Sequence, residues 1–255
     1  MKTTVSAFTG LVSMFLLLVI PCFGIDLPQA IPAHEGFTLH MPAGWKPIPR
    51  EVLDRYSREI AKLAPKAEKQ AYDYGFQRED TPKWFAYPYI LVQVKRSGRI
   101  PEEQLESLQR IEKAMDDSFA KASDSLSSFT SGASIGKPLY DASHHILWTQ
   151  VAIDVKEIGT VRGVIGAILT GEGFVQIACY ARDADFKNYL PLFEAIVKNT
   201  ELSKDLRYSA DNGKVAKKRE DGKKGPVSME TMALVFAAAA LIIIGWRASR
   251  KKSGR

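Results

Sequence analysis

The C-terminal part of the chain contains sixteen consecutive residues without a charge, Thr231–Trp246 (TMALVFAAAALIIIGW). Extended back to Pro226, the segment would form a helix of about 31 Å, enough to cross a hydrocarbon core of ~30 Å. A helix of a globular core is rarely apolar on every side over such a length, since one face normally meets water. We therefore predict a transmembrane helix over residues 229–246.

The residues around this segment predict its orientation. Residues 247–255 contain Lys and Arg but no acidic residue, which is typical of a short cytoplasmic tail. The basic linker of residues 206–228 would then lie on the outer side, either on anionic headgroups or as a solvated spacer. The predicted membrane-flanking residues are Trp246, Arg247, Arg250, Lys251 and Lys252.

The N-terminus has the layout of a secretory signal peptide over residues 1–24. Lys2 precedes a short apolar core, Leu11–Ile20, which Pro21 ends. Two alternatives stay open: a lipid on Cys22, or an uncleaved anchor. In each case we expect residues 25–205 to form an extracytoplasmic domain, periplasmic or on the cell surface, held by a single-pass membrane helix.

The charge distribution argues against nucleic acid as a partner. The chain of 255 residues has a formal net charge of +6. Residues 25–210, however, hold 23 Lys and Arg against 25 Asp and Glu. A nucleic-acid surface needs clustered basic residues on the folded body. Cys179 is the one cysteine outside the predicted signal peptide, so no internal disulfide is expected there, and we predict that Cys179 is a small core residue.

The hydrophobic pattern of the body alternates between strand and helix periods. Pro42, Ala43 and Gly44 predict a turn after the first strand, and the Ser-rich stretch 123–134 predicts a loop. The predicted strands are 37–41, 84–94, 146–155, 161–169 and 174–180, and the predicted helices are 50–63, 66–72, 101–126 and 186–199. This order indicates an α+β fold, an antiparallel sheet with helices packed on it in a sandwich-like α/β/α arrangement.

Two segments carry a resemblance to a known family. GFTLHMPAGWKPI, from Gly36, resembles the first strand and Pro-x-Gly-Trp turn of PsbP-like domains, including bacterial lipoproteins of the DcrB type. FVQIACYARDADFKNYLPLFEAIVKNTEL, from Phe174, is similar to their last strand and C-terminal helix. The resemblance implies a sandwich-like domain that acts in binding or assembly rather than in catalysis.

The sequence contains few groups arranged for chemistry. His34, His40, His144 and His145 lack the spacing of a zinc site, and no nucleophile elbow, phosphate loop or dinucleotide motif is present. We therefore predict no catalytic residue, metal or cofactor. Asp183 and Asp185 suit the start of a helix. The candidate binding surface is an aromatic set that could instead fill the core, namely Trp45, Trp84, Phe85, Tyr87 and Tyr89.

These observations predict a membrane-anchored extracytoplasmic binding or assembly module. Its expected partners are the lipid bilayer and another envelope or membrane protein. The alternative is a hydrolase-like envelope enzyme whose site is assembled from residues distant in sequence. A deep pocket that converges on His40, His144 or Asp185 would favour the enzyme.

Overall fold

The computed structural model describes residues 25–63, 71–101 and 130–209, together with residues 105, 112, 113 and 115–117. The predicted signal peptide, most of the basic linker, the predicted span and the membrane-flanking residues 246–252 lie outside the described residues. In the part of the chain that is described, no helix combines the length and the apolar character needed to cross a bilayer.

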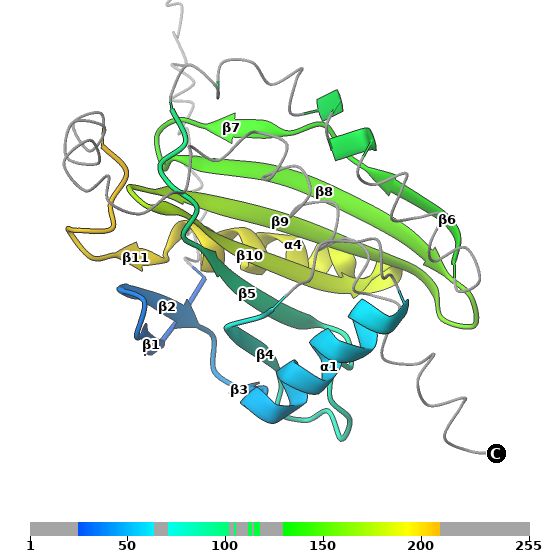
Figure 1. Cartoon of the computed structure of the whole chain (residues 1–255). Coiled ribbons are helices and arrows are strands. Elements are labelled where there is room, and N and C mark those ends of the chain that lie inside the picture. Colours follow the sequence, from blue (N-terminus) through cyan, green and yellow to red (C-terminus); the bar gives the residue numbers. More distant parts are fainter. Residues whose placement is uncertain are drawn as a thin grey trace, which may run out of the picture.

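An antiparallel sheet forms the centre of the domain (Figure 1). Its strands follow the order β3-β4-β5-β10-β9-β8-β6, and β7 also pairs with β8. The strand bounds are β3 (Trp45–Pro47), β4 (Tyr74–Arg78), β5 (Tyr89–Lys95), β6 (Thr130–Ile135), β7 (Leu139–Asp141), β8 (Ile146–Val155), β9 (Gly159–Thr170) and β10 (Gly173–Arg182). The three long strands β8, β9 and β10 form a continuous meander, because short turns join them.

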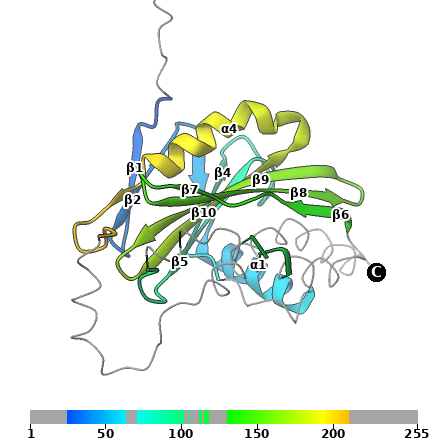
Figure 2. The ribbon, with the colours of Figure 1, turned by 90° about the horizontal axis from the view of Figure 1, so that it is seen from above.

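Two helices lie on opposite faces of this sheet (Figure 2). Helix α1 (Arg50–Leu63) covers one face, and α4 (Asp183–Lys198) packs on β9 and β10 from the other. On the α4 side a second, three-stranded sheet joins β1 (Gln29–Ala33), β2 (Phe37–Met41) and β11 (Glu201–Leu202). The layers therefore form the α+β arrangement that the sequence predicted.

Each face of the sheet has its own apolar core. On the α1 face, Tyr56 stacks on Phe85 with ring centroids 4.0 Å apart, and both rings are buried against the sheet. On the α4 face, Phe193 and Ile196 are fully buried against β9 and β10. Cys179 belongs to this second core, and burial raises the pKa of its thiol far above the ordinary range. The prediction of a core cysteine is confirmed.

Most of the predicted elements occur where the hydrophobic period placed them. The strands at 37–41 and 146–155 and the helix at 50–63 have the predicted bounds, and the last two strands are slightly longer than predicted. The final helix begins at Asp183, three residues before the predicted start, with Pro191 inside it. Gly44 takes a φ of +77° in the predicted turn, a conformation that glycine adopts without a Cβ penalty.

The predicted strand 84–94 is wrong in its first half, because β5 begins only at Tyr89. The preceding loop is organised by Gln77, a buried side chain of β4. Its Oε1 accepts a hydrogen bond from the Phe85 N–H at 2.8 Å, and its Nε2 donates to Lys83 O at 3.0 Å. Phe85 has a φ of +57°, and Pro88 has no N–H to donate to a ladder. The aromatic composition that favours a strand is therefore overridden by these local contacts.

Other differences fall on short or polar segments. Part of the Ser-rich stretch predicted as a loop forms β6, which pairs with β8. The short strands β1, β3, β4, β7 and β11 are absent from the predicted elements. The predicted helix 66–72 lies mostly outside the described residues, and Ala71 and Tyr72 are not helical. Of the predicted helix 101–126, Pro101 is described but not helical, whereas residues 105, 112, 113 and 115–117 are helical, and Leu105 and Met115 are buried as predicted.

Candidate functional site

A pocket of about 560 Å³ opens on the α4 face, beside the C-terminal end of that helix. The pocket lies where the face of β8 passes beyond the cover of α4, which packs on β9 and β10. Strands β7, β8 and β9, the loop before β7 and helix α4 all contribute to it. Its lining residues are Gly136, Lys137, Leu139, Tyr140, Asp141, Trp148, Thr149, Gln150, Val164, Glu194 and Lys198.

The indole of Trp148 packs over Gly166, its register partner on β9. A Cβ at Gly166 would lie 3.2 Å from Trp148 Cζ3 and 2.6 Å from Val197 Cγ1, so this glycine leaves room for both side chains. Lys198, in the last turn of α4, places its Nζ 5.9 Å from the centroid of the indole. The pocket therefore has an aromatic wall whose exposed face attracts positive charge.

Charged side chains of both signs surround this wall. The lining contains two lysines, Lys137 and Lys198, and two acidic residues, Asp141 and Glu194. Lys137 is 84% exposed and lies 3.3 Å from Glu112 Oε1. Leu139, at 65% exposure, is an unusually open apolar side chain at the edge of the pocket. An apolar centre with a mixed polar rim is the usual composition of a binding site for a small molecule.

Asp141 also organises the turn between β7 and β8. Its carboxylate accepts hydrogen bonds from Ser143 Oγ at 2.6 Å and from His144, whose Nδ1 lies 2.8 Å from Oδ2. The Ser143 hydroxyl, followed by His144, lowers the pKa of Asp141 to about 2. Ser143 Oγ is also 2.9 Å from the same Nδ1. A hydrolytic triad needs the acid and the nucleophile on opposite ring nitrogens, so this group has the geometry of a turn rather than of a proton relay.

The five predicted aromatic residues do not form one exposed surface. Trp45 is buried in the core of the α4 face, whereas Phe85 and Tyr89 are buried in the core of the α1 face. Trp84 and Tyr87 are half-buried against the α1-face core, and Lys46 Nζ lies 5.4 Å from the Trp84 centroid. Trp45, Phe85 and Tyr89 therefore follow the alternative in which members of the set fill the core.

His40, His145 and the aspartates Asp183 and Asp185 lie at different places in the fold, each with its own surroundings. His40 Nε2 is 3.2 Å from Glu201 Oε1 in the small sheet, and His145 Nδ1 is 3.0 Å from the Tyr140 hydroxyl. Asp183 and Asp185 occupy the first turn of α4, where Asp183 pairs with Arg162. None of His40, His144 and Asp185 lines the pocket. Among the described residues, no three His, Cys, Asp or Glu side chains are grouped to hold a metal ion; that no metal or cofactor is needed stays a prediction.

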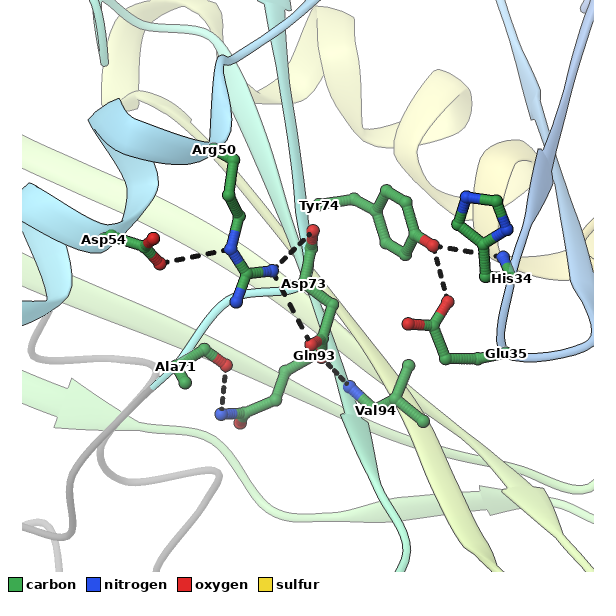
Figure 3. A network of polar contacts seen from close by, with 9 residues as sticks. All are labelled: His34, Glu35, Arg50, Asp54, Ala71, Asp73, Tyr74, Gln93 and Val94. Carbon is green, nitrogen blue, oxygen red and sulfur yellow. Dashed lines mark hydrogen bonds and ion pairs between the residues drawn. The ribbon is translucent and has the colours of Figure 1, made fainter.

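A second polar cluster links β1–β2, α1, β4 and β5 at the far end of the sheet (Figure 3). Tyr74 donates to Glu35 Oε2 at 2.5 Å and accepts from the His34 N–H at 3.2 Å. Asp73 Oδ2 accepts from the Val94 N–H at 2.7 Å, and Asp73 Oδ1 lies 4.0 Å from Arg50 Nη1. The side chains of Tyr74, Glu35 and Asp73 all bind groups of neighbouring elements, so we assign the cluster to holding the β1–β2 turn and α1 against the sheet.

Asp73→Asn should make the protein more stable at neutral pH. Burial raises the pKa of Asp73, partly offset by the Val94 N–H, so the folded protein holds this proton more tightly than the unfolded chain. Stability from this group therefore increases as the pH falls through the folded pKa and is complete below the unfolded value of ~3.9. We expect a higher midpoint of thermal unfolding for the variant at pH 7, and no difference below about pH 4.

The control for this prediction is Asp54→Asn. Asp54 pairs with the same Arg50 at 3.1 Å, but on an exposed helix surface where an ion pair contributes little. A destabilised Asp73→Asn at pH 7, or a difference that persists at pH 3, would show that the Arg50 contact outweighs the burial of the carboxylate.

The pocket residues were not singled out in the sequence. Trp148, Gln150, Ala152 and Asp154 alternate along β8 on one face, and Gln150 and Asp154 are exposed. A tryptophan on the same strand face as polar residues indicates a sheet face that its covering helix leaves partly open. Lys198 and Glu194 carried no comparable signal, because they read as the polar side of an amphipathic helix.

Comparison with known proteins gives a resemblance in structure alone. No family model matches the sequence, and no curated protein matches it. The chain is similar to a PsbP protein. The solution structure of cyanobacterial PsbP (CyanoP) from Synechocystis sp. PCC 6803 is 11% identical, with a TM-score of 0.39 over 71% of this chain and 95% of that chain. This is the resemblance to PsbP-like domains that the sequence predicted.

A second solved structure gives a similar result. LpqN, involved in cell envelope biogenesis of Mycobacterium tuberculosis, is 14% identical, with a TM-score of 0.35 over 69% of this chain and 91% of that chain. TM-scores below 0.5 mark a distant likeness, from which neither a ligand nor an activity follows.

Proposed function

We propose that the chain is a membrane-anchored extracytoplasmic module that binds a ligand or partner at the pocket beside α4. The observation that carries the binding part is the pocket itself, an aromatic wall with a charged rim on a rigid sheet and helix. The anchoring and the location rest on the two apolar segments of the sequence, Leu11–Ile20 and Thr231–Trp246.

Binding without chemistry is supported by the arrangement of the reactive groups. Ser143, His144 and Asp141 lie side by side, but both partners of His144 converge on Nδ1. Cys179 is fully buried, and burial disfavours its nucleophilic thiolate. The alternative, a hydrolase-like envelope enzyme, would draw on the Ser143 cluster. In that case Ser143→Ala would abolish hydrolysis of an ester probe such as p-nitrophenyl acetate, whereas a binding module gives the same background rate in both forms.

Two reporter fusions test the location. Alkaline phosphatase, which folds only outside the cytoplasm, is placed after Ser209 in one fusion and after Arg255 in the other. We expect activity in the first and none in the second, since the predicted span separates the two positions. Full activity after Arg255, or none after Ser209, would contradict the proposed topology. Immunoblots with antibodies against peptides that contain Leu53 and Phe193 confirm that both fusions are made intact.

A further inference from the structure

We propose that the pocket beside α4 binds an uncharged carbohydrate, with the indole of Trp148 as the surface on which a pyranose ring stacks. This inference rests on the proposed function, because it names the class of ligand for the same pocket. It is carried by three features of the described residues: the indole face, the balance of charges on the rim, and the size of the pocket.

The indole face is open to the pocket and rich in electrons. Trp148 and Lys198 both line the pocket, and the Lys198 ammonium lies 5.9 Å above the ring, so this face already attracts a positive group. The C–H bonds on one face of a pyranose carry small positive charges, and they pack on the same negative π-surface. A sugar ring can thus take the place of the flexible lysine head while it keeps the apolar contact.

The rim contains as many acids as bases. Lys137 and Lys198 line the pocket together with Asp141 and Glu194, so an ion of either sign would meet a like charge. A hydroxyl group, by contrast, both donates and accepts a hydrogen bond. It can accept from a lysine ammonium and donate to a carboxylate at the same time. The exposed amide of Gln150 adds a further donor and acceptor beside the indole. This mixture suits a neutral ligand with many hydroxyls.

The pocket has the size and the rigidity of a small-molecule site. Its volume of about 560 Å³ lies within the range of ~300–1,000 Å³ that is usual for such sites. The indole lies over Gly166 on the central strand β9 and packs against the apolar core that includes Val197 of α4. A stacking surface held by a strand and a helix needs little reorganisation when the ligand binds.

The test is calorimetric titration of the full-length protein in nanodiscs, which avoids detergents that carry a sugar headgroup. The probes are the linear trimers of glucose, mannose, galactose and N-acetylglucosamine, with triglutamate and trilysine peptides as charged competitors. The variants are Trp148→Leu, which removes the stacking surface, and Trp148→Phe, which keeps an aromatic ring. Tyr189→Leu is the matched control, because Tyr189 is a half-buried aromatic of α4 outside the pocket.

We expect at least one trimer to bind the wild-type protein and Tyr189→Leu equally. Trp148→Leu should weaken that binding by roughly tenfold, whereas Trp148→Phe should keep it within about threefold. Thermal unfolding checks that each variant is folded. If a charged peptide binds and none of the trimers does, the carbohydrate inference is overturned, but the proposal that the pocket binds a ligand stands. Binding of no probe, or of a trimer with full strength to Trp148→Leu, would overturn the inference as well. The reporter fusions test the location of the domain independently of these titrations.

Discussion

Gly173→Ala should cost the domain about 3–5 kcal/mol of its unfolding free energy, the sum of backbone strain and steric overlap. Gly173 starts β10 after the Gly171–Glu172 turn and has a φ of +148°. A Cβ there would lie 1.9 Å from the carbonyl oxygen of Lys95 and 3.1 Å from the backbone nitrogen of Ser97. Backbone atoms of β5 and of the loop after it cannot rotate away as a side chain does, so β5 and β10 would have to separate at this end.

The measurement is equilibrium unfolding in urea, followed by circular dichroism, with Gly159→Ala as the matched control. Gly159, the first residue of β9, has a φ of +89°, but nothing lies within 4 Å of its missing Cβ. The control should therefore show only the left-handed strain of about 1–2 kcal/mol. If both variants lose the same stability, the contact with Lys95 is not what requires glycine at position 173.

Gly166→Ala should cost about 1–3 kcal/mol and deform the pocket. Its φ is not unusual, so the effect is steric: the new methyl would lie 2.6 Å from Val197 Cγ1 and 3.2 Å from Trp148 Cζ3. Val197 is buried in α4 and β-branched, which leaves it few alternative rotamers. The C-terminal end of α4 would have to lift from β9, and the indole would lose its support.

A double-mutant cycle with Val197→Ala separates this cause from others. Val197→Ala alone creates a cavity and destabilises, but in the double variant it removes the two methyl groups nearest to the new Cβ. We expect the double variant to be clearly more stable than the sum of the single losses predicts, by about 0.5–3 kcal/mol. Additive losses would mean that the Gly166 methyl does not meet Val197, and that the helix and the strand are not in this close contact.

The spacing of the apolar residues was sufficient to predict the long helices and strands. β8, α1 and α4 each bury one apolar face, whereas β9 and β10 are buried on both faces and contain long apolar runs. Short elements lack that information. β7 and β11 have three and two residues, and they form because β8 and β2 offer free backbone groups, not because their own side chains favour a strand.

The strand prediction for the aromatic segment before β5 is wrong for a different reason. Its composition favours a strand, but the buried Gln77 side chain binds the Phe85 N–H and Lys83 O and holds the segment as a loop. No local pattern indicates that a glutamine on a neighbouring strand will do this. The same loop places Phe85 under α1, so this member of the candidate binding surface belongs to the core.

What the sequence determined by itself is therefore the α+β class, the antiparallel meander, the helix faces and the buried thiol, because each follows from which residues leave water. It also carries the two apolar segments on which the proposed location rests. Only the tertiary structure decided the pocket. Trp148, Gly166 and Lys198 come from β8, β9 and α4, and they meet because α4 crosses the sheet where Gly166 has no side chain. A contact between elements so far apart depends on packing, which no single segment of the chain encodes.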